Sequence, residues 1–334
     1  AHGASGRLAR LAEPFAANRS ADAAKQRGGA YRSTLGRTAG QLPAPIRFSL
    51  TLVRRGAWRF ADAAVEICTF TGRRACVNKP LDYIYPSPPE GLDPKALDLK
   101  HIPKHVALIM DGNGRWAKAR GKNRLSGHKA GIEAVRESIR MASDLGIRYL
   151  TIYSFSSENW KRPPEEVIGL MDLFAKTMLA EVAELHKEHV RVKTIGDLSM
   201  LPPKTRDAFK QAWETTKDNS GMTLVVAVNY GGRKEIVDAA AAFAQAAQEA
   251  HERGEELECT EETFAKFLYT SDIPDPELLI RTSGEMRISN FLLWQIAYSE
   301  FVVTDVLWPD FDRYEFLRAL LQYQGRDRRF GGVK

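Results

Sequence analysis

Residues 105–121 read HVALIMDGNGRWAKARG, and this stretch decides how the main domain is built. Its first half is an apolar run typical of a buried strand, and the run ends on the acid Asp111. Two glycines then remove side chains where the strand turns into a helix, so that free backbone N–H groups can receive an anion. The candidate residues of this turn are Asp111, Gly112, Asn113, Gly114, Arg115 and Trp116.

Downstream of this turn, apolar strand-like runs alternate with segments long enough to be crossover helices. The six runs are VALIMD, YLTIYSFS, VRVKTIG, MTLVVAVN, ELLIRTS and EFVVTDV. Such alternation predicts an α/β fold, with a mostly parallel central sheet of about six strands flanked by helices. We expect a single domain over residues 105–334. Ligands of such sheets gather at the carboxyl ends of the strands.

The composition argues against a membrane-embedded protein and against a nucleic-acid-binding protein. The chain has 334 residues, of which 44% are hydrophobic and 27% charged, and no uninterrupted apolar stretch is long enough to span a bilayer. The net charge of +6 comes from the first 60 residues, which hold eleven Lys or Arg and two acids. The rest of the chain sums to −3, so we expect no nucleic-acid partner. The three cysteines form no CxxC pair, which argues against a disulfide framework or a zinc site.

Two segments precede the main domain. Residues 1–42 are rich in Ala, Gly and Arg and poor in acids, which is typical of an organelle transit peptide, and a disordered leader is the alternative. Residues 43–104 combine an amphipathic segment with a proline-rich linker that we expect to be extended. The amphipathic part, residues 46–70, is a candidate for peripheral membrane contact, although it could equally be a helix packed on the main domain or a disordered leader.

The glycine turn also fits the dinucleotide pattern GxGxxA, with Ala117 in third place. Two features argue against a dinucleotide: no acid stands at the end of the second strand, and bulky side chains fill positions that are usually small. No GxxxxGK[ST] motif occurs. At this point a nucleotide and another phosphate ester both remain open.

Polar residues at the other strand ends favour diphosphates. The second predicted strand is followed by Ser156, Asn159, Trp160 and Arg162; the fifth is followed by Arg281, Glu285, Arg287 and Ser289; Arg124 and His128 stand near the first helix. The planar fork of arginine suits a diphosphate, and five arginines at one sheet edge indicate two of them. Two diphosphates and a single carboxylate, Asp111, predict Mg2+.

A long amphipathic helix over residues 165–189 supplies an apolar stripe next to these groups. Its members are Val167, Leu170, Met171, Phe174, Met178, Val182 and Leu185. Such a stripe is usually core, but here it could also wall a tunnel for a hydrocarbon chain.

With these motifs in hand, residues 105 to about 332 closely resemble the cis-prenyltransferases, the undecaprenyl and dehydrodolichyl diphosphate synthase family. The motifs that carry the resemblance are MDGNGRWA, GHKAG, FSSENWKRP, NYGGR, RTSGEMRISNFLLWQ and WPDF. The resemblance implies a transferase that condenses isopentenyl diphosphate onto an allylic diphosphate of the geranyl or farnesyl type, with Mg2+ as cofactor.

The resemblance also implies roles for individual residues. Asp111 would organise Mg2+, with Glu300 as a carboxylate near the metal. Gly112, Asn113, Gly114 and Arg115, with Arg124 and His128, would bind the allylic diphosphate; Arg281, Arg287 and Ser289 would bind isopentenyl diphosphate. Ser156, Asn159, Trp160 and Arg162 would form a loop that closes over the substrates and helps in proton removal. Candidates for the proton acceptor are Asp111, Asn113 and the released diphosphate.

Further expectations concern assembly and location. The ending RRFGG resembles a tail that completes the neighbouring subunit's site through Arg329 and Gly331. We therefore expect a homodimer, with a heteromer as the alternative. Met286 stands where many bacterial members have His, which puts a direct role for that position in doubt. A non-catalytic partner subunit is the alternative function, but the catalytic residues are present. We expect a plastid location, with a mitochondrion or the cytosolic face of the endoplasmic reticulum as alternatives.

Overall fold

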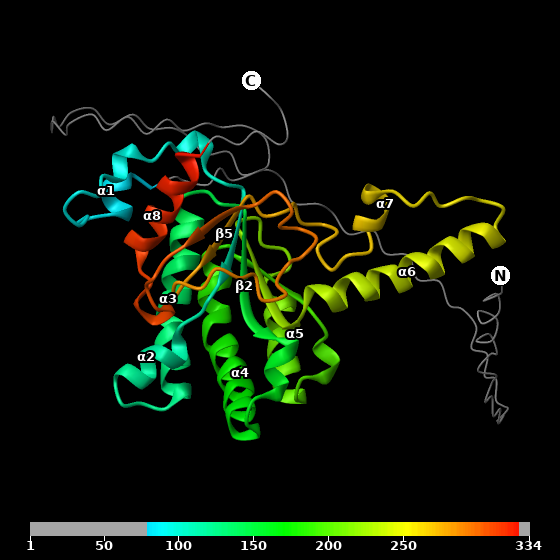
Figure 1. Ribbon diagram of the computed structural model, residues 1–334, viewed down its shortest axis with the longest axis horizontal. Helices are drawn as coiled ribbons and strands as arrows, with labels where there is room; N and C mark the ends of the chain where they lie inside the picture. The colour runs from blue at the N-terminus through cyan, green and yellow to red at the C-terminus, as the bar shows by residue number, and fades with distance from the viewer. Residues whose placement is uncertain (1–78, 327–334) are drawn as a thin grey trace, which may run out of the picture. The chain divides into compact units, whose positions relative to one another are not determined.

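The computed structural model describes residues 79–326, which form a six-stranded sheet flanked by helices (Figure 1). Neighbouring strands lie in the order β3-β4-β2-β1-β5-β6, and every pair is parallel. The strands are β1 (His105–Ile109), β2 (Tyr149–Ser156), β3 (Arg191–Ile195), β4 (Thr223–Tyr230), β5 (Leu278–Arg281) and β6 (Glu300–Val303). The predicted α/β fold and its six strands are confirmed.

Helices lie between most consecutive strands, and one more helix follows β6. They are α2 (Asn113–Ala119), α3 (Arg124–Asp144), α4 (Pro164–Lys187), α5 (Pro203–Thr216), α6 (Gly232–Glu252) and α8 (Arg313–Gln324), with the short helix α7 (Glu261–Ala265). Short 3₁₀ turns include η3 (Ser157–Lys161), η4 (Leu198–Met200) and η5 (Trp308–Asp310). Helix α4 contacts both α3 and α5, and these three cover one side of the sheet (Figure 1).

The two faces of the sheet belong to two hydrophobic cores. Along β1, Val106 and Leu108 join the core beneath α3, α4 and α8, whereas Ala107 and Ile109 join the core on the opposite face. This alternation follows from the two-residue period of a strand. Because both faces are covered, the strand sequences are almost continuously apolar, which made them recognisable.

The segment before β1 differs from the expected extended linker. Residues 79–104 contain α1 (Leu81–Ile84), η1 (Pro94–Ala96) and η2 (Leu99–His101). Ile84 and Tyr85 are 2% exposed and belong to the core, and Arg313 of α8 donates a hydrogen bond to the carbonyl of Ile84. The prediction is therefore wrong for this part, because a few apolar side chains between the prolines anchor the segment. The rest of residues 1–104, including the amphipathic part, lies outside the described range.

Among residues 79–326, no helix combines the length and the apolar character that crossing a bilayer requires.

Candidate active site

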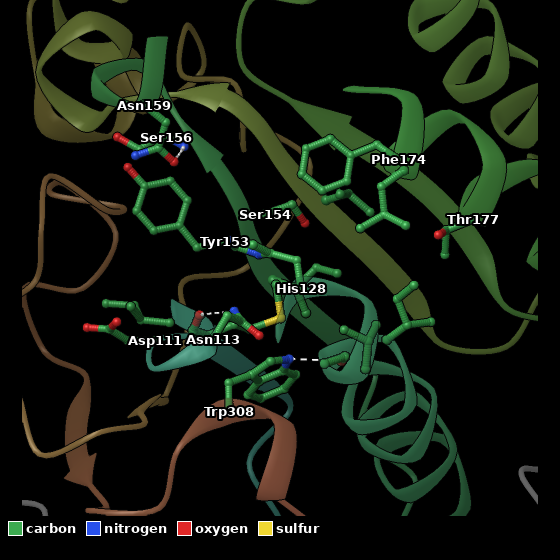
Figure 2. Close-up of a pocket in the computed structure, with 18 of the residues that line it drawn as sticks. Asp111, Asn113, His128, Tyr153, Ser154, Ser156, Asn159, Phe174, Thr177 and Trp308 are labelled. Atoms are coloured by element: carbon green, nitrogen blue, oxygen red, sulfur yellow. Dashed lines mark hydrogen bonds between the residues drawn. The ribbon is translucent and has the colours of Figure 1, made fainter. Parts of the chain in front are cut away.

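A cavity of about 820 Å³ opens at the carboxyl ends of the central strands, between the sheet and helices α3 and α4. Asp111 and Asn113 lie on one side of it, and Phe174 and Thr177 lie on the other (Figure 2). Its volume is in the range of small-molecule sites. Eight predicted site residues line it: Asp111, Asn113, His128, Ser156, Asn159, Arg162, Arg281 and Ser289.

The chain turns sharply after β1, and this turn holds Asp111. Gly112 has a φ of 107° and caps α2, and a Cβ there would lie 3.0 Å from Leu307. The hydroxyl of Thr282 donates to the carbonyl of Asp111 at 2.6 Å and accepts from its N–H at 2.9 Å. The backbone of Asp111 is therefore fixed by the residue that follows β5, the neighbouring strand.

The carboxylate of Asp111 faces two guanidinium groups. Arg281, whose side chain is 6% exposed, donates to Asp111 Oδ2 at 2.8 Å, and Arg115 lies 3.4 Å from the same oxygen. Burial raises the pKa of Asp111, but the hydrogen bonds from Arg281 and Gly112 and the charge of Arg115 outweigh it, so the pKa lies below its usual value. Asp111 is therefore ionised at neutral pH, as a cation ligand must be.

Two clusters of arginines surround the mouth of the cavity. In the first, Arg115 pairs with Asp111 and Glu285, Arg281 donates to Ser289 Oγ at 2.9 Å, and Arg287 pairs with Glu285. In the second, Glu166 lies 3.0 Å from Arg162 and 3.4 Å from Arg124. Arg115 was expected with the second group but lies in the first. Two separate cationic clusters suit two anionic groups.

His128 lies beside the second cluster. Burial, and then the charges of Arg162 and Arg124, lower the pKa of His128 to about 4, so its imidazole is neutral at pH 7. Its Nε2 atom is buried and has no hydrogen-bond partner among the described residues. The same holds for Asn113 Oδ1. Buried polar atoms without partners are uncommon in folded proteins, and here both belong to side chains that line the cavity.

Glycines bring α2 close to α3 at this point. A Cβ on Gly127 would lie 2.0 Å from the carbonyl oxygen of Asn113, and one on Gly131 would lie 2.6 Å from Asn113 Oδ1. Trp308 Nε1 also donates to the carbonyl of Gly131 at 3.0 Å (Figure 2). The GHKAG motif therefore sets the position of Asn113 by leaving room for it.

The loop after β2 is held by its own capping interactions. Ser156 caps η3, and its N–H donates to Asn159 Oδ1 at 3.1 Å (Figure 2). Trp160 does not line the cavity; its indole donates to Asn229 at 2.8 Å and packs against Phe155. A register irregularity in β2 near Tyr153 lets neighbouring residues of one strand face the cavity, as β-bulges do.

Backbone strain gathers at the first cluster. Ser283, Ser289 and Asn290 have φ values of 73°, 49° and 60°. Each such conformation costs about 1–3 kcal/mol and persists only where the surrounding structure holds it, often at a functional site. Here it positions the hydroxyl of Ser289 against Arg281.

Other predicted site residues lie outside the cavity. Trp116 donates to Asp310 at 2.7 Å and stacks with Arg120, and Gly114 makes room for Arg124. Glu300 begins β6 at the amino end of the sheet and pairs with Arg326 at 2.8 Å. Within one chain it therefore does not meet Asp111, which follows the carboxyl end of β1. Arg329 and Gly331 lie outside the described residues.

Several residues of the site were not predicted from the sequence. Arg233, Glu158, Asn290 and Trp308 line the cavity, and Thr282 clamps Asp111. Arg233 follows a glycine pair at the end of β4, and that strand-end position was the signal that could have identified it. Met286 is 89% exposed.

A parallel α/β sheet with two cationic clusters beside a partly apolar cavity suits one class of protein, the enzymes that act on amphiphilic anions. Comparison with known proteins agrees. Residues 109–331 match the family model described as putative undecaprenyl diphosphate synthase. The chain belongs to this cis-prenyltransferase family, and it is a transferase of prenyl groups.

Individual relatives cover the same region. An isoprenyl transferase of Thermotoga maritima is 52% identical over 70% of this chain and 98% of its own length. One from Bacillus subtilis is 51% identical over 70% of this chain and 88% of its own. Lavandulyl diphosphate synthase from Lavandula x intermedia, solved with dimethylallyl diphosphate, is 40% identical with a TM-score of 0.65, and the match covers 69% of this chain and 98% of that one. A probable undecaprenyl diphosphate synthase from Campylobacter jejuni has a TM-score of 0.56 at 30% identity, over 69% and 98% of the two chains.

Proposed function

We propose that this protein condenses isopentenyl diphosphate onto an allylic diphosphate primer, in a Mg2+-dependent reaction that gives a cis-polyprenyl diphosphate. The observation that carries the proposal is the division of one cavity into a charged mouth and an apolar interior. Asp111, Arg162 and Arg281 lie at the mouth, whereas Phe174, Met178 and Leu185 of α4 line the interior. A diphosphate with a hydrocarbon tail has the same division.

The two clusters assign the two substrates. Arg124 and Arg162 of the second cluster, with His128 beside them, adjoin the apolar wall and would bind the allylic diphosphate whose chain enters the cavity. Arg281 and Arg287 of the first cluster, with Ser289, would bind isopentenyl diphosphate. On substrate binding, these arginines would exchange their present carboxylate partners for phosphate oxygens.

The reaction forms a carbon–carbon bond and breaks a carbon–oxygen bond. The double bond of isopentenyl diphosphate attacks the allylic carbon and the allylic diphosphate departs. A proton of the isopentenyl unit then passes to a base, for which Asp111 and the released diphosphate are the candidates, and a new double bond forms. Negative charge grows on the departing diphosphate, and guanidinium groups fixed in advance stabilise that charge. The apolar wall excludes water, which would otherwise intercept the allylic carbon.

The residues present fit a magnesium ion that is bound together with substrate. Although no group of three or more His, Cys, Asp or Glu side chains in residues 79–326 is arranged to hold a metal, Mg2+ does not require such a group. Mg2+ commonly takes one or two carboxylates, with substrate phosphates and water completing its shell. Asp111 is ionised and its side chain is 30% exposed, so it offers that carboxylate. A bound Mg2+ would neutralise diphosphate charge; Asp111 would hold it in place.

The test is incorporation of radiolabelled isopentenyl diphosphate by the purified chain, with dimethylallyl, geranyl or farnesyl diphosphate as primer. We expect incorporation with Mg2+ and none with EDTA. A chain that is inert alone but stimulates a second subunit would instead be the non-catalytic partner. Turnover that is unaffected by EDTA would contradict the magnesium proposal.

We also propose a homodimer and a plastid location. The dimer proposal rests on the tail containing Arg329 and Gly331, and the location rests on the composition of residues 1–42. Sedimentation of the full chain tests the first. Import of a reporter fused to residues 1–42 into isolated plastids, beside isolated mitochondria, tests the second.

A further inference from the structure

Two charged residues that line the cavity have no place in diphosphate binding. Asp111, Glu158, Arg162, Arg233 and Arg281 lie at the carboxyl edge of the sheet, where the diphosphates would sit. The remaining charged residues of the lining are Arg136 of α3 and Glu181 of α4.

These two residues lie deep along the cavity. Helices α3 and α4 both run from the carboxyl edge of the sheet toward its amino end, because each follows the mouth in sequence and precedes the next strand. Arg136 comes one turn after Ile132, and Glu181 comes one turn after Thr177. Phe174 and Thr177 already lie on the side of the cavity away from Asp111 (Figure 2). A growing hydrocarbon would therefore reach the pair after its first additions.

Arg136 and Glu181 bridge the two helices. Arg136 Nη2 lies 2.5 Å from Glu181 Oε1, and the side chains are 43% and 23% exposed. Around them the lining is apolar: Val135, Ile139, Met178, Leu185, Phe209 and Leu224. Phe209 and Leu224 are each 2% exposed, so the sheet side of the deep end is closed by core. The ion pair thus joins α3 to α4 in the cavity wall, between partly solvent-exposed surface and the apolar lining.

Arg136 has a second partner. Its Nη1 lies 2.9 Å from Glu133 Oε2 on the same helix, and the Glu133 side chain is 66% exposed. Arg136 can thus release Glu181 and remain paired on the solvent side. Glu181 has no second cationic partner among the ion pairs of residues 79–326. The Arg136–Glu181 pair, called the latch below, can therefore separate while Arg136 stays paired with Glu133.

We propose that the Arg136–Glu181 ion pair sets the product length, because a chain that outgrows the cavity must part the pair before it can extend between α3 and α4. The inference rests on the proposed function. Parting the pair exposes a carboxylate to hydrocarbon, which is unfavourable, so elongation slows at that length. Shorter intermediates never reach the pair, so early additions are unaffected by it.

The experiment compares products of the full-length enzyme by chromatography after dephosphorylation. Arg136→Met with Glu181→Met removes the latch, and we expect the main product to lengthen by at least one isoprene unit. Glu181→Met alone should behave the same way, because Glu133 still holds Arg136. Arg136→Met alone should give no lengthening, because an unpaired Glu181 then faces the chain.

Lys176→Met is the matched control. Lys176 lies on α4 and pairs with Asp172 at 2.7 Å, and neither residue lines the cavity. It removes a charge from the same helix and should leave the product unchanged. The rate of the first addition should stay within about twofold of wild type in every variant. If the double variant does not fold, Glu181→Gln, which keeps the volume, should still lengthen the product.

The outcomes are distinguishable. Absence of the first addition in wild type would reject the proposed function. A normal first addition with the same product length in wild type, the double variant and Glu181→Gln would reject the latch. Equal lengthening by Arg136→Met and Glu181→Met would show that any loosening of the contact between α3 and α4 suffices, and would also reject it.

Discussion

Substituting alanine at Gly131 tests whether close packing of α2 against α3 positions the active site. A Cβ at this residue would lie 2.6 Å from Asn113 Oδ1 and 2.7 Å from Trp308 Cδ1. Two opposing effects act on the free energy of unfolding of this variant. Alanine is favoured over glycine inside a helix by about 1 kcal/mol. Overpacking costs about 1–3 kcal/mol.

The net change in the free energy of unfolding should therefore be a loss of about 0–2 kcal/mol, which a domain of ordinary stability tolerates. Activity should suffer more. Asn113 must move to relieve the overlap, and a misplacement of about 1 Å in a site can cost about 10²-fold. We expect kcat/KM for isopentenyl incorporation to fall by at least about tenfold.

Gly169→Ala is the control, because it makes the same change in α4. A Cβ there would meet only the end of the Leu125 side chain, at 3.1 Å, and that side chain can move. We expect stability to be unchanged or raised by up to about 1 kcal/mol, with activity within about twofold of wild type. Urea unfolding and initial rates measure both effects. A Gly131→Ala enzyme that is destabilised but fully active would refute the reasoning.

Three other predictions follow from the same contacts. Arg281→Met removes the main hydrogen-bond donor to Asp111 Oδ2, so incorporation should fall by at least about 100-fold and the free energy of unfolding by about 1–3 kcal/mol; normal kinetics would contradict this assignment. Burial lowers the pKa of His105 to about 4, so the unfolded chain binds more protons than the folded one, and the free energy of unfolding should fall by up to about 3 kcal/mol as the pH drops from about 6.5 to 4. Urea unfolding of His105→Gln should lack this pH-dependent loss, and the same pH profile in wild type and variant would show that His105 does not cause it. Removal of residues 1–42 should leave the rate unchanged, and loss of soluble enzyme would show that they are structural.

The strands could be predicted because a sheet covered on both faces requires almost continuous apolar runs. Their carboxyl ends then placed Asp111, Arg281 and Ser289 at one edge without any knowledge of side-chain contacts. The apolar stripe on α4 could be predicted, but its core residues could not be told apart from those that line the cavity. The structure shows Val167 and Val182 in the core, whereas Phe174 and Met178 face the cavity.

Contacts between distant segments could not be predicted from a single sequence. The grouping of five arginines into two clusters depends on Glu166 and Glu285, which no motif singled out as partners. Glu300 was expected beside the metal. It is the first residue of β6, so it lies at the amino end of the sheet, opposite the carboxyl ends of the strands where Asp111 lies. The prolines before His105 predicted an extended linker, but they alternate with apolar residues such as Tyr85 that fold onto α8.

The proposed function depends most on Asp111, the carboxylate that would hold Mg2+ at the mouth of the cavity. The most direct measurement is isopentenyl incorporation over a series of Mg2+ concentrations, for wild type and Asp111→Ala, with urea unfolding to compare their stability. Because the carboxylate faces an open mouth, the variant should remain folded and should show no turnover at any Mg2+ concentration. Near-normal turnover by a folded Asp111→Ala enzyme would contradict the account.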